Sequence, residues 1–253
     1  MRLSTVHGLI RRRILVNFRV DADVMQRELP PPFRPKLLSG AAVAGICLIR
    51  LEQMRPGFLA LPLGLSSENA AHRVAVHWTD AGGWEREGVY IPRRDTDSRL
   101  NRLVGGWLFP GEHRPARFRI RERGRQIDFA MRSADHGVAL RLRARLADRL
   151  PATSRFATLA EASTFFERGA IGYSATRDPG CLDGLCLSTR GWRVEPLEVE
   201  SVYSSYFADP AHFPPGSVTF DCALLMRTLG CEWQALGRLA LGAGARAPVQ
   251  LSR

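Results

Sequence analysis

The chain of 253 residues is 45% hydrophobic and carries a formal net charge of +11, a composition typical of a globular protein with a substantial core. No stretch approaches the roughly 18–20 consecutive apolar residues that a membrane helix needs, so a membrane-spanning protein is not expected. Nearly all the positive charge is arginine, because Lys36 is the only lysine, and the arginines are scattered along the chain. This pattern favours a solvated arginine-rich surface over nucleic-acid binding, which we keep as the less favoured interpretation.

Two further features concern the cellular compartment. The first residues contain no apolar segment of the kind found in secretory signals, and the five cysteines are an odd number. Both features favour a cytoplasmic protein without a disulfide framework. Cys181 and Cys186 form the only close pair, and no second Cys or His pair accompanies them, so no metal and no cofactor is expected.

The first third of the chain predicts strands interrupted by one short helix. Strands are expected at residues 12–20, 41–51 and 68–78, a loop at 54–67 and a turn at 81–83. The apolar run at 41–51 is continuous, which indicates a strand buried on both faces. Residues 21–29 predict a helix that Asp21 caps and that the prolines after Leu29 end.

A dense polar segment follows a short predicted strand at residues 88–91. Arg93, Arg94, Asp95 and Asp97 come directly after it, and Asp97 or Ser98 can cap a helix through Leu100, Leu103 and Val104. Gly105 and Gly106 would end that helix, and Pro110-Gly111 would turn the chain into Glu112-His113. Charge at both ends of a short helix, between apolar strands, indicates the lining of a pocket.

The clearest periodicity lies in the middle of the chain. Residues 116–121, 126–132 and 138–146 alternate apolar side chains with polar or small ones, and many of the alternating residues are arginine. This predicts an antiparallel meander with one solvated face. A helix at 158–170, a loop to about 185, and late strands at 187–202 and 218–226 follow, with a frayed tail at 242–253. Without a repeat or a linker, residues 1–253 are expected to form one domain.

The order of these segments resembles a known superfamily. ILVNFRVDADVMQRELPPPF, at residues 14–33, resembles the strand–helix–proline opening of acetoacetate decarboxylase and its relatives. YIPRRDTDSRLNRLVGGWLFPGEH, at 90–113, is similar to the segment that leads through a helix to the Phe/Tyr-Pro-Lys-Lys turn of these proteins. The resemblance covers most of residues 11–227 and includes the bacterial branch of unknown function. It implies a mainly β (α+β) fold, an antiparallel cone-shaped β-barrel or curved sheet with a few helices, around a small-molecule pocket.

The chain departs from this superfamily at the turn. In the decarboxylases the turn carries a lysine that forms a Schiff base with the substrate, and a second lysine lowers the pKa of the first. Here these positions are Gly111 and Glu112. Glycine offers no nucleophile, and a carboxylate would raise the pKa of a neighbouring amine. Decarboxylation through an iminium is therefore not expected, and a Schiff base relocated to Lys36 is less favoured than a surface lysine.

Other superfamily positions keep useful side chains. The resemblance places Arg11 at an arginine ahead of the first strand and Glu68 at a pocket glutamate. An arginine can hold a carboxylate and a glutamate can move a proton. Glu112 or Asp95 could orient His113 as a general base. The plainer alternatives are a solvated carboxylate at a strand end for Glu68 and a surface turn for His113.

Arg93 and Arg94 point to opposite faces if the strand continues, so at most one can enter the pocket. The other would then pair with Asp95 or Asp97. A metal site formed by His72, Glu68 and His113 has no close-spaced ligand cluster to support it. Neither a phosphate-binding glycine loop nor a G-x-S-x-G nucleophile elbow is present, which disfavours nucleotide-dependent and serine-hydrolase chemistry.

The sequence thus predicts a barrel that binds a small oxo acid or similar anion. Glu68 and His113 would be catalytic in a non-covalent isomerisation, dehydration or hydration, and Arg11, Arg94, Asp95 and Glu112 would bind the substrate. The alternative is a non-catalytic ligand-binding or scaffold barrel, and the third hypothesis is nucleic-acid binding through the arginine-rich face. Homo-oligomerisation and the identity of the anion are left open.

Overall fold

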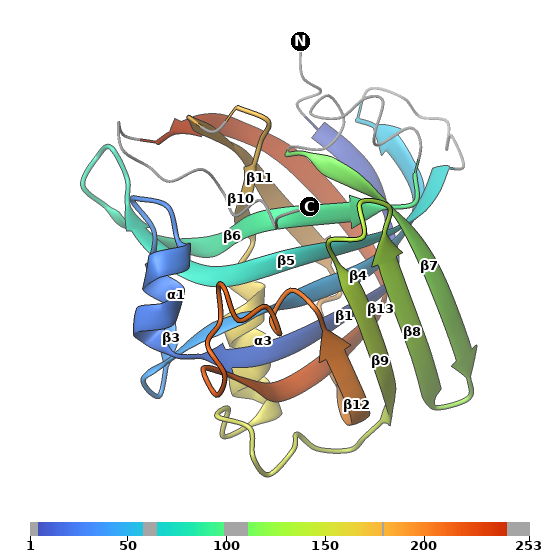
Figure 1. The fold of residues 1–253 in the computed structure, drawn as a ribbon. Coiled ribbons are helices and arrows are strands. Elements are labelled where there is room, and N and C mark those ends of the chain that lie inside the picture. Colours follow the sequence, from blue (N-terminus) through green and yellow to red (C-terminus); the bar gives the residue numbers. More distant parts are fainter. Residues whose placement is uncertain (1–4, 58–64, 99–110, 179, 242–253) are drawn as a thin grey trace.

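In the described part of the chain, one strongly curved sheet is accompanied by two short helices, α1 and α3 (Figure 1). The computed structural model describes residues 5–57, 65–98, 111–178 and 180–241. The helix expected at residues 100–104 and the tail expected to fray at 242–253 lie outside these residues. A mainly β architecture of this kind confirms the predicted fold class.

The sheet has 13 strands. They are β1 (Thr5–Val20), β2 (Arg34–Pro35), β3 (Leu37–Leu38), β4 (Ala41–Pro56), β5 (Leu65–Thr79), β6 (Glu85–Thr96), β7 (His113–Arg123), β8 (Gln126–Ser133), β9 (Ala139–Leu146), β10 (Ile171–Ala175), β11 (Cys181–Arg190), β12 (Glu195–Ser204) and β13 (Val218–Ala240). The helices are α1 (Ala22–Glu28) and α3 (Leu159–Glu167).

Strand pairing closes the sheet into two rings that share one layer. β13, β1, β4, β5 and β6 lie side by side and form the shared layer. β10 and β11 join β6 back to β13 and close the first ring. β7, β8, β9 and β12 also join β6 to β13 and close the second ring. Closure leaves few unpaired strand edges, which protects a β protein from edge-to-edge association.

Each ring has its own apolar core, because successive side chains of a strand point to opposite faces. Along β1, Ile14 and Val16 pack with the β7–β9 meander, whereas Leu15 packs with residues of α3, β11 and β13. In β4, Ile46 and Leu48 belong to the second ring and Cys47 to the first. The shared layer is therefore buried on both faces, as the continuous apolar run of β4 predicts.

The meander has the alternation that the sequence predicts. Ile127, Phe129 and Met131 of β8 are buried in the second ring, and their neighbours face outward or are partly buried. Leu140 and Leu142 of β9 are also buried, while Arg141, Arg143 and other arginines of these strands are exposed. The period-two pattern thus explains much of the arginine on this face.

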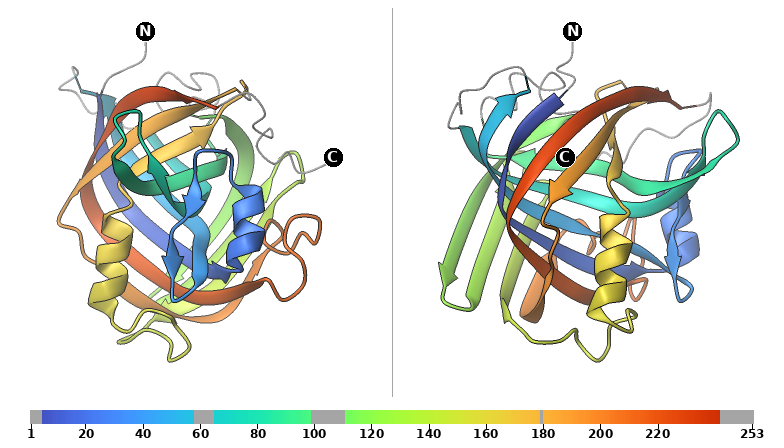
Figure 2. Two further views of the ribbon diagram at one scale, coloured as in Figure 1. Left: turned by 90° about the vertical axis from the view of Figure 1, so that its left-hand side faces the viewer. Right: turned by 180° about the vertical axis from the view of Figure 1, so that it is seen from behind.

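The helices also begin where the sequence predicts. The Asp21 side chain accepts hydrogen bonds from the backbone N–H groups of Asp23 and Val24 and so caps α1, satisfying donors that lack partners within the helix. The Thr158 hydroxyl accepts from the N–H of Glu161 and caps α3. α3 lies well apart from the meander (Figure 2) and contributes Phe166 to the core of the first ring. No helix in the described part of the chain is long and apolar enough to cross a bilayer.

Three expectations were wrong. β6 continues through Arg93, Arg94 and Asp95, where the sequence suggested a polar turn. Residues 171–185, expected to be a loop, form β10 and much of β11, which pair with β6 and β13. β13 extends to Ala240 rather than ending near residue 226. In each case pairing with strands distant in sequence decides the structure, because the local propensity is weak.

Leu140 and Arg141 test the register of the meander, since Leu140 is fully buried and Arg141 is exposed. We expect Leu140→Ala to lower the free energy of unfolding by about 2–5 kcal/mol, because it leaves a cavity in the second ring. The matched change Arg141→Ala should stay within about 0.5 kcal/mol of the wild type. Urea unfolding followed by circular dichroism measures both, and equal losses would contradict the register.

Candidate functional site

A partly open cavity of about 100 Å³ lies inside the first ring. One water molecule needs only about 10–15 Å³ of such space, so the cavity has room for a small ligand. Its wall is largely apolar and combines side chains from the shared layer with β10 and β11. The lining residues are Arg13, Cys47, Ile49, Leu51, Asn69, Ala70, Ala71, Arg73, Val89, Ile91, Arg94, Asp95, His113, Gly169, Ala170, Gly172, Leu185, Leu187 and Trp233.

The strand register explains why arginines enter this cavity. Leu15, Cys47, Ala71 and Arg94 form one row across β1, β4, β5 and β6. Two residues earlier along β1, Arg13 lies opposite Ile49 of β4. Two residues later along β1, Asn17 lies opposite Gly45 of β4, and Gly45 lies opposite Arg73 of β5. Because residues two apart along a strand share a face, arginines from three strands converge on one side of the shared layer.

Arg73 is the most deeply buried of these arginines, with 5% of its surface exposed. It donates a hydrogen bond to Oδ1 of Asn17 at 2.5 Å, and its guanidinium carbon lies 4.8 Å from the centre of the Phe166 ring. Burial lowers the pKa of Arg73 to about 10, and repulsion from Arg13 adds to the effect. The guanidinium therefore remains charged at neutral pH, in a place where charge is costly.

Arg13 and Arg94 also donate hydrogen bonds to acceptors that are not carboxylates. Nε of Arg94 donates to Oγ of Ser174 at 3.0 Å, and burial lowers the pKa of Arg94 to about 10. Nε of Arg13 donates to Sγ of Cys47 at 3.3 Å, and its guanidinium carbon lies 5.6 Å from the centre of the Trp192 ring. Within the described residues, no carboxylate forms an ion pair with Arg13, Arg73 or Arg94. Among the described residues, these three arginines therefore have no carboxylate partner in the cavity.

His113, the first residue of β7, lies beside Arg94 at one side of the cavity. Burial and the charge of Arg94 together lower the pKa of His113 to about 3, although a hydrogen bond with the backbone of Gly111 works in the opposite direction. The imidazole is neutral at pH 7, which suits a proton acceptor. Arg94 and His113 are thus brought together, as the sequence-based hypothesis requires.

Gly111, which the sequence resemblance places at the position of the superfamily lysine, is buried next to this part of the cavity wall. Its φ of +90° lies in the left-handed region that favours glycine. A Cβ atom there would come within 2.6 Å of Cβ of Ser174, the residue that holds Arg94. The backbone N–H of Gly111 donates to Oδ2 of Asp183 at 3.2 Å. The local packing is therefore built for a residue without a side chain.

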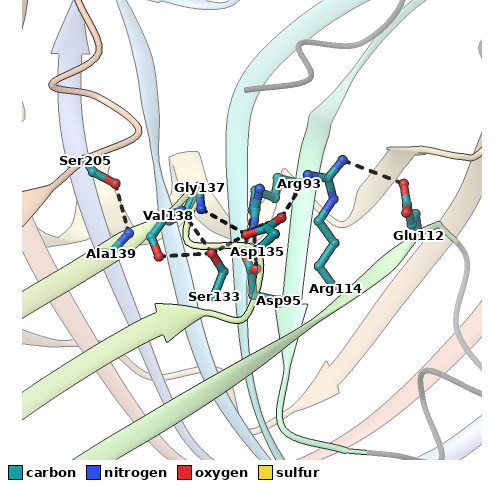
Figure 3. Close-up of polar contacts among 10 residues, drawn as sticks. All are labelled: Arg93, Asp95, Glu112, Arg114, Ser133, Asp135, Gly137, Val138, Ala139 and Ser205. Atoms are coloured by element: carbon teal, nitrogen blue, oxygen red, sulfur yellow. Dashed lines mark hydrogen bonds and ion pairs between the residues drawn. The ribbon is translucent and has the colours of Figure 1, made fainter. Parts of the chain in front are cut away.

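Arg93 points away from the cavity, and carboxylates neutralise it (Figure 3). Its guanidinium donates to Asp95 at 2.9 Å and to both oxygens of Asp135 at 3.0 Å. Asp135 also accepts from Arg114, Ser133 and the N–H of Gly137. Although burial works in the opposite direction, these donors hold the pKa of Asp135 well below its usual range. This cluster ties the β8–β9 turn to β6.

Glu68 and Arg11, by contrast, lie outside the cavity. Glu68 faces the second ring, where Nη2 of Arg12 lies 2.6 Å and Nη1 of Arg50 lies 3.2 Å from its carboxylate oxygens. Burial raises the pKa of Glu68, although Arg12 and Arg50 oppose the shift. Arg11 is exposed. Together with Glu122, Arg12 and Glu68, it borders a polar groove. The structure therefore separates Glu68 and Arg11 from Arg94 and His113 by the thickness of the shared layer.

The carboxylates of Asp95 and Glu112 also point elsewhere. Asp95 borders the cavity, but both its oxygens accept from Arg93 on the other face. Glu112 lies 3.9 Å from Arg114 and 4.0 Å from Arg177 in ion pairs that are partly exposed. Both carboxylates are therefore paired with arginines other than Arg13, Arg73 and Arg94.

Sequence reasoning missed Arg13, Arg73 and Cys47. Their positions along β1, β4 and β5 place the three side chains on one face of the sheet, because side chains alternate along a strand. This alternation could have predicted that they lie together. It could not have shown which face holds the cavity, because both faces of the shared layer are buried. His72, considered as a metal ligand, is fully buried on the face opposite to the cavity. No group of three or more potential ligands for a metal ion occurs among the described residues.

Several solved structures share this fold. A structure of acetoacetate decarboxylase matches with a TM-score of 0.59 and 11% identity, over 96% of this chain and 92% of that chain. An acetoacetate decarboxylase-like enzyme from Sphingomonas wittichii RW1 matches with a TM-score of 0.56 and 15% identity, over 94% of both chains. The enduracididine biosynthesis enzyme MppR, complexed with pyruvate, matches with a TM-score of 0.57 and 13% identity, over 96% of this chain and 91% of that chain. These similarities define the class as an acetoacetate decarboxylase-like β fold.

A sequence comparison then gives the particular family. Residues 9–215 match the family model DUF2071, described as an uncharacterized conserved protein. Because the match spans most of the chain, the chain belongs to this family. The predicted membership in an acetoacetate decarboxylase-like branch of unknown function is thus confirmed. A comparison with curated proteins gives no significant match.

The electrostatic coupling between Arg94 and His113 can be measured directly. Because burial and the Arg94 charge together depress the pKa of His113 to about 3, we expect Arg94→Gln to raise that pKa. His72, whose pKa is also about 3, is affected by burial and Arg93 instead and should not respond. NMR titration of the histidine ring resonances tests this. An unchanged His113, or an equal shift at both histidines, would contradict the coupling.

Proposed function

We propose that the cavity binds a small carboxylate of the oxo-acid class through Arg13, Arg73 and Arg94, without a Schiff base. The observation that carries this proposal is the set of three guanidinium groups, that of Arg73 buried and those of Arg13 and Arg94 half-buried, that no carboxylate neutralises within the described residues. An uncompensated buried charge is costly, and a bound anion offsets that cost with charge-assisted hydrogen bonds. The apolar wall of Ile91, Leu185 and Trp233 suits the short hydrocarbon part of such a ligand.

The other arginines of the protein show why this site is distinctive. Arg12 reaches Glu68 and Glu122 at 2.6 and 2.7 Å, and Arg93 is neutralised in the same way by Asp95 and Asp135. In those places the protein supplies its own anion. Among the described residues, the acceptors that the cavity arginines reach are Asn17, Ser174 and the Cys47 sulfur rather than carboxylates, so a bound anion would supply the missing negative charge.

His113 is the group that could add acid/base chemistry. A carboxylate bound next to Arg94 would offset the positive charge that lowers the His113 pKa, so ligand binding would make the imidazole a stronger base. An isomerisation, dehydration or hydration of the bound acid could use that proton acceptor. Glu68 enters no step, because its carboxylate lies on the opposite face of the layer.

The structural relatives support the ligand class. MppR has a similar fold and was solved in complex with pyruvate, which shows that a fold of this class can accommodate a small oxo acid. Nucleic-acid binding receives less support. Two of the exposed meander arginines, Arg143 and Arg145, pair with Asp128 and Glu198 at 3.0 and 2.8 Å. These ion pairs reduce the positive charge that the outer face of the meander offers to phosphates.

The proposal predicts ligand-induced thermal stabilisation. Pyruvate at about 100 times its dissociation constant should stabilise the folded protein by about 2.7 kcal/mol, which is several degrees in melting temperature. Arg94→Gln and Arg73→Gln should each weaken binding by at least about tenfold, because each removes a charge-assisted hydrogen bond. Differential scanning fluorimetry across a panel of oxo and hydroxy acids gives the affinity of each variant.

Arg119→Gln is the matched control, since Arg119 is an exposed arginine of the meander. It should bind pyruvate like the wild type. Ligand-free Arg94→Gln should melt no lower than the wild type, because the substitution removes an uncompensated charge. Wild-type melting temperatures that do not respond to any acid of the panel, or Arg94→Gln and Arg73→Gln proteins that respond as strongly as the wild type, would refute the site.

A second prediction concerns the Schiff base. The amine of Lys36 forms an ion pair with Glu87 and lies 4.4 Å from the centre of the Phe165 ring. The residue lines a smaller neighbouring cavity that Arg13 and Arg73 also border, and not the proposed ligand cavity. Borohydride reduction in the presence of pyruvate should therefore leave the protein mass unchanged. A mass increase that Lys36→Arg abolishes would establish an iminium and overturn the proposed non-imine binding.

A further inference from the structure

Cys47 lines the cavity from the shared layer. It lies on β4 between Leu15 of β1 and Ala71 of β5 in the same row, and 8% of its surface is exposed. Arg94 follows Ala71 in this row, on β6. Because Ala71 carries only a methyl group, little side-chain bulk separates the Cys47 sulfur from the Arg94 side of the cavity.

The arginines of the cavity surround this sulfur. Nε of Arg13 donates a hydrogen bond to Sγ of Cys47 at 3.3 Å, so the sulfur acts as the acceptor. Arg73 extends from the adjacent row, and its buried Nε has no hydrogen-bond partner among the described residues. Reactive cysteines lie in electropositive, partly accessible surroundings of this kind. The unsatisfied Nε of Arg73 independently indicates that an acceptor is missing from the same cavity.

The other cysteines have surroundings that disfavour a thiolate. Burial raises the pKa of Cys222 to about 12, and the nearby Asp221 adds to the effect. Burial likewise raises the pKa of Cys231 to about 12 and, less strongly, those of Cys181 and Cys186. A thiol reagent therefore meets weak competition elsewhere in the protein.

We propose that Cys47 is a nucleophilic thiol, and that the arginines deliver small electrophiles bearing a carboxylate to it. The natural ligand class rests on the proposed function. With an α-oxo acid, Sγ of Cys47 attacks the carbonyl carbon and an S–C bond forms. The π bond of the carbonyl opens, and its oxygen takes the proton that the thiol gives up. The product is a reversible thiohemiketal, and the step requires neither oxidant nor reductant.

Iodoacetate and iodoacetamide provide the test. Both alkylate thiolates, with an S–C bond formed, the C–I bond broken and iodide released, but only iodoacetate carries a carboxylate. Rates are followed by intact mass, and the modified residue by peptide mapping, with free cysteine as the reference thiol. We expect Cys47 to be labelled first, with an iodoacetate-to-iodoacetamide rate ratio at least about tenfold above that of free cysteine, equivalent to about 1.4 kcal/mol.

The variants assign the effect to the cavity. Arg73→Gln and Arg94→Gln should return the ratio toward the value for free cysteine, and Cys47→Ser should abolish the fast labelling. Cys186→Ser is the matched control and should behave like the wild type, because Cys186 does not line the cavity. First labelling at another cysteine, or a ratio equal to that of free cysteine, would overturn the inference.

The test also separates this inference from the proposed function. A protein that pyruvate stabilises, but whose Cys47 shows no preference for iodoacetate, would retain the anion site and lose the nucleophile. A protein with fast, arginine-dependent labelling of Cys47 but no response to any oxo acid would retain the nucleophile, and the proposed ligand class would be wrong.

Discussion

Side chains on a strand point alternately to its two faces, so two arginines that follow each other cannot share an environment. In β1, Arg12 enters the second ring and Arg13 enters the first, and in β6 Arg93 and Arg94 divide in the same way. Glutamates and aspartates neutralise Arg12 and Arg93. Among the described residues, Arg13 donates to the sulfur of Cys47 and Arg94 donates to the hydroxyl of Ser174, and neither pairs with a carboxylate. The functional character of the cavity follows from this division.

The two rings provide different partners for the arginines on the two faces of the shared layer. A layer buried on both faces would normally be apolar, because an unpaired buried charge costs several kcal/mol. On the second-ring face the cost is offset by close ion pairs, and the Asp135 cluster also fastens the meander to β6 (Figure 3). On the first-ring face the charge is partly offset by Asn17, Ser174 and the Phe166 ring. The remaining cost is what an anionic ligand would remove.

The absence of the superfamily lysine fits the same picture. A lysine at position 111 would add another cation beside Arg94 and would collide with Ser174. The glycine leaves Ser174 free to hold Arg94, and burial together with the charge of Arg94 lowers the pKa of His113. In the site that we propose, anion recognition by arginine replaces a Schiff base, and Cys47 is the nucleophile that we propose for the same cavity.

Much of the fold could be predicted from the sequence because its signals are local. The meander follows from strict alternation at residues 116–146, and α1 follows from Asp21 and the prolines after Leu29. β10 and the long end of β13 could not be predicted, because pairing with remote strands stabilises them. Arg94 and His113, which the sequence predicts in one pocket, both line the cavity, and their roles remain a proposal. Glu68 was assigned to that pocket from its superfamily position, but on a doubly buried layer the pattern of apolar residues does not reveal which face encloses a cavity.

A crystal structure of the protein grown with pyruvate tests the central claim most directly. The account predicts electron density for the ligand inside the first ring, with its carboxylate within hydrogen-bonding distance of at least two guanidinium groups among Arg13, Arg73 and Arg94. Pyruvate bound only in the polar groove at Arg12 and Glu68, or only at exposed arginines of the meander, would contradict it.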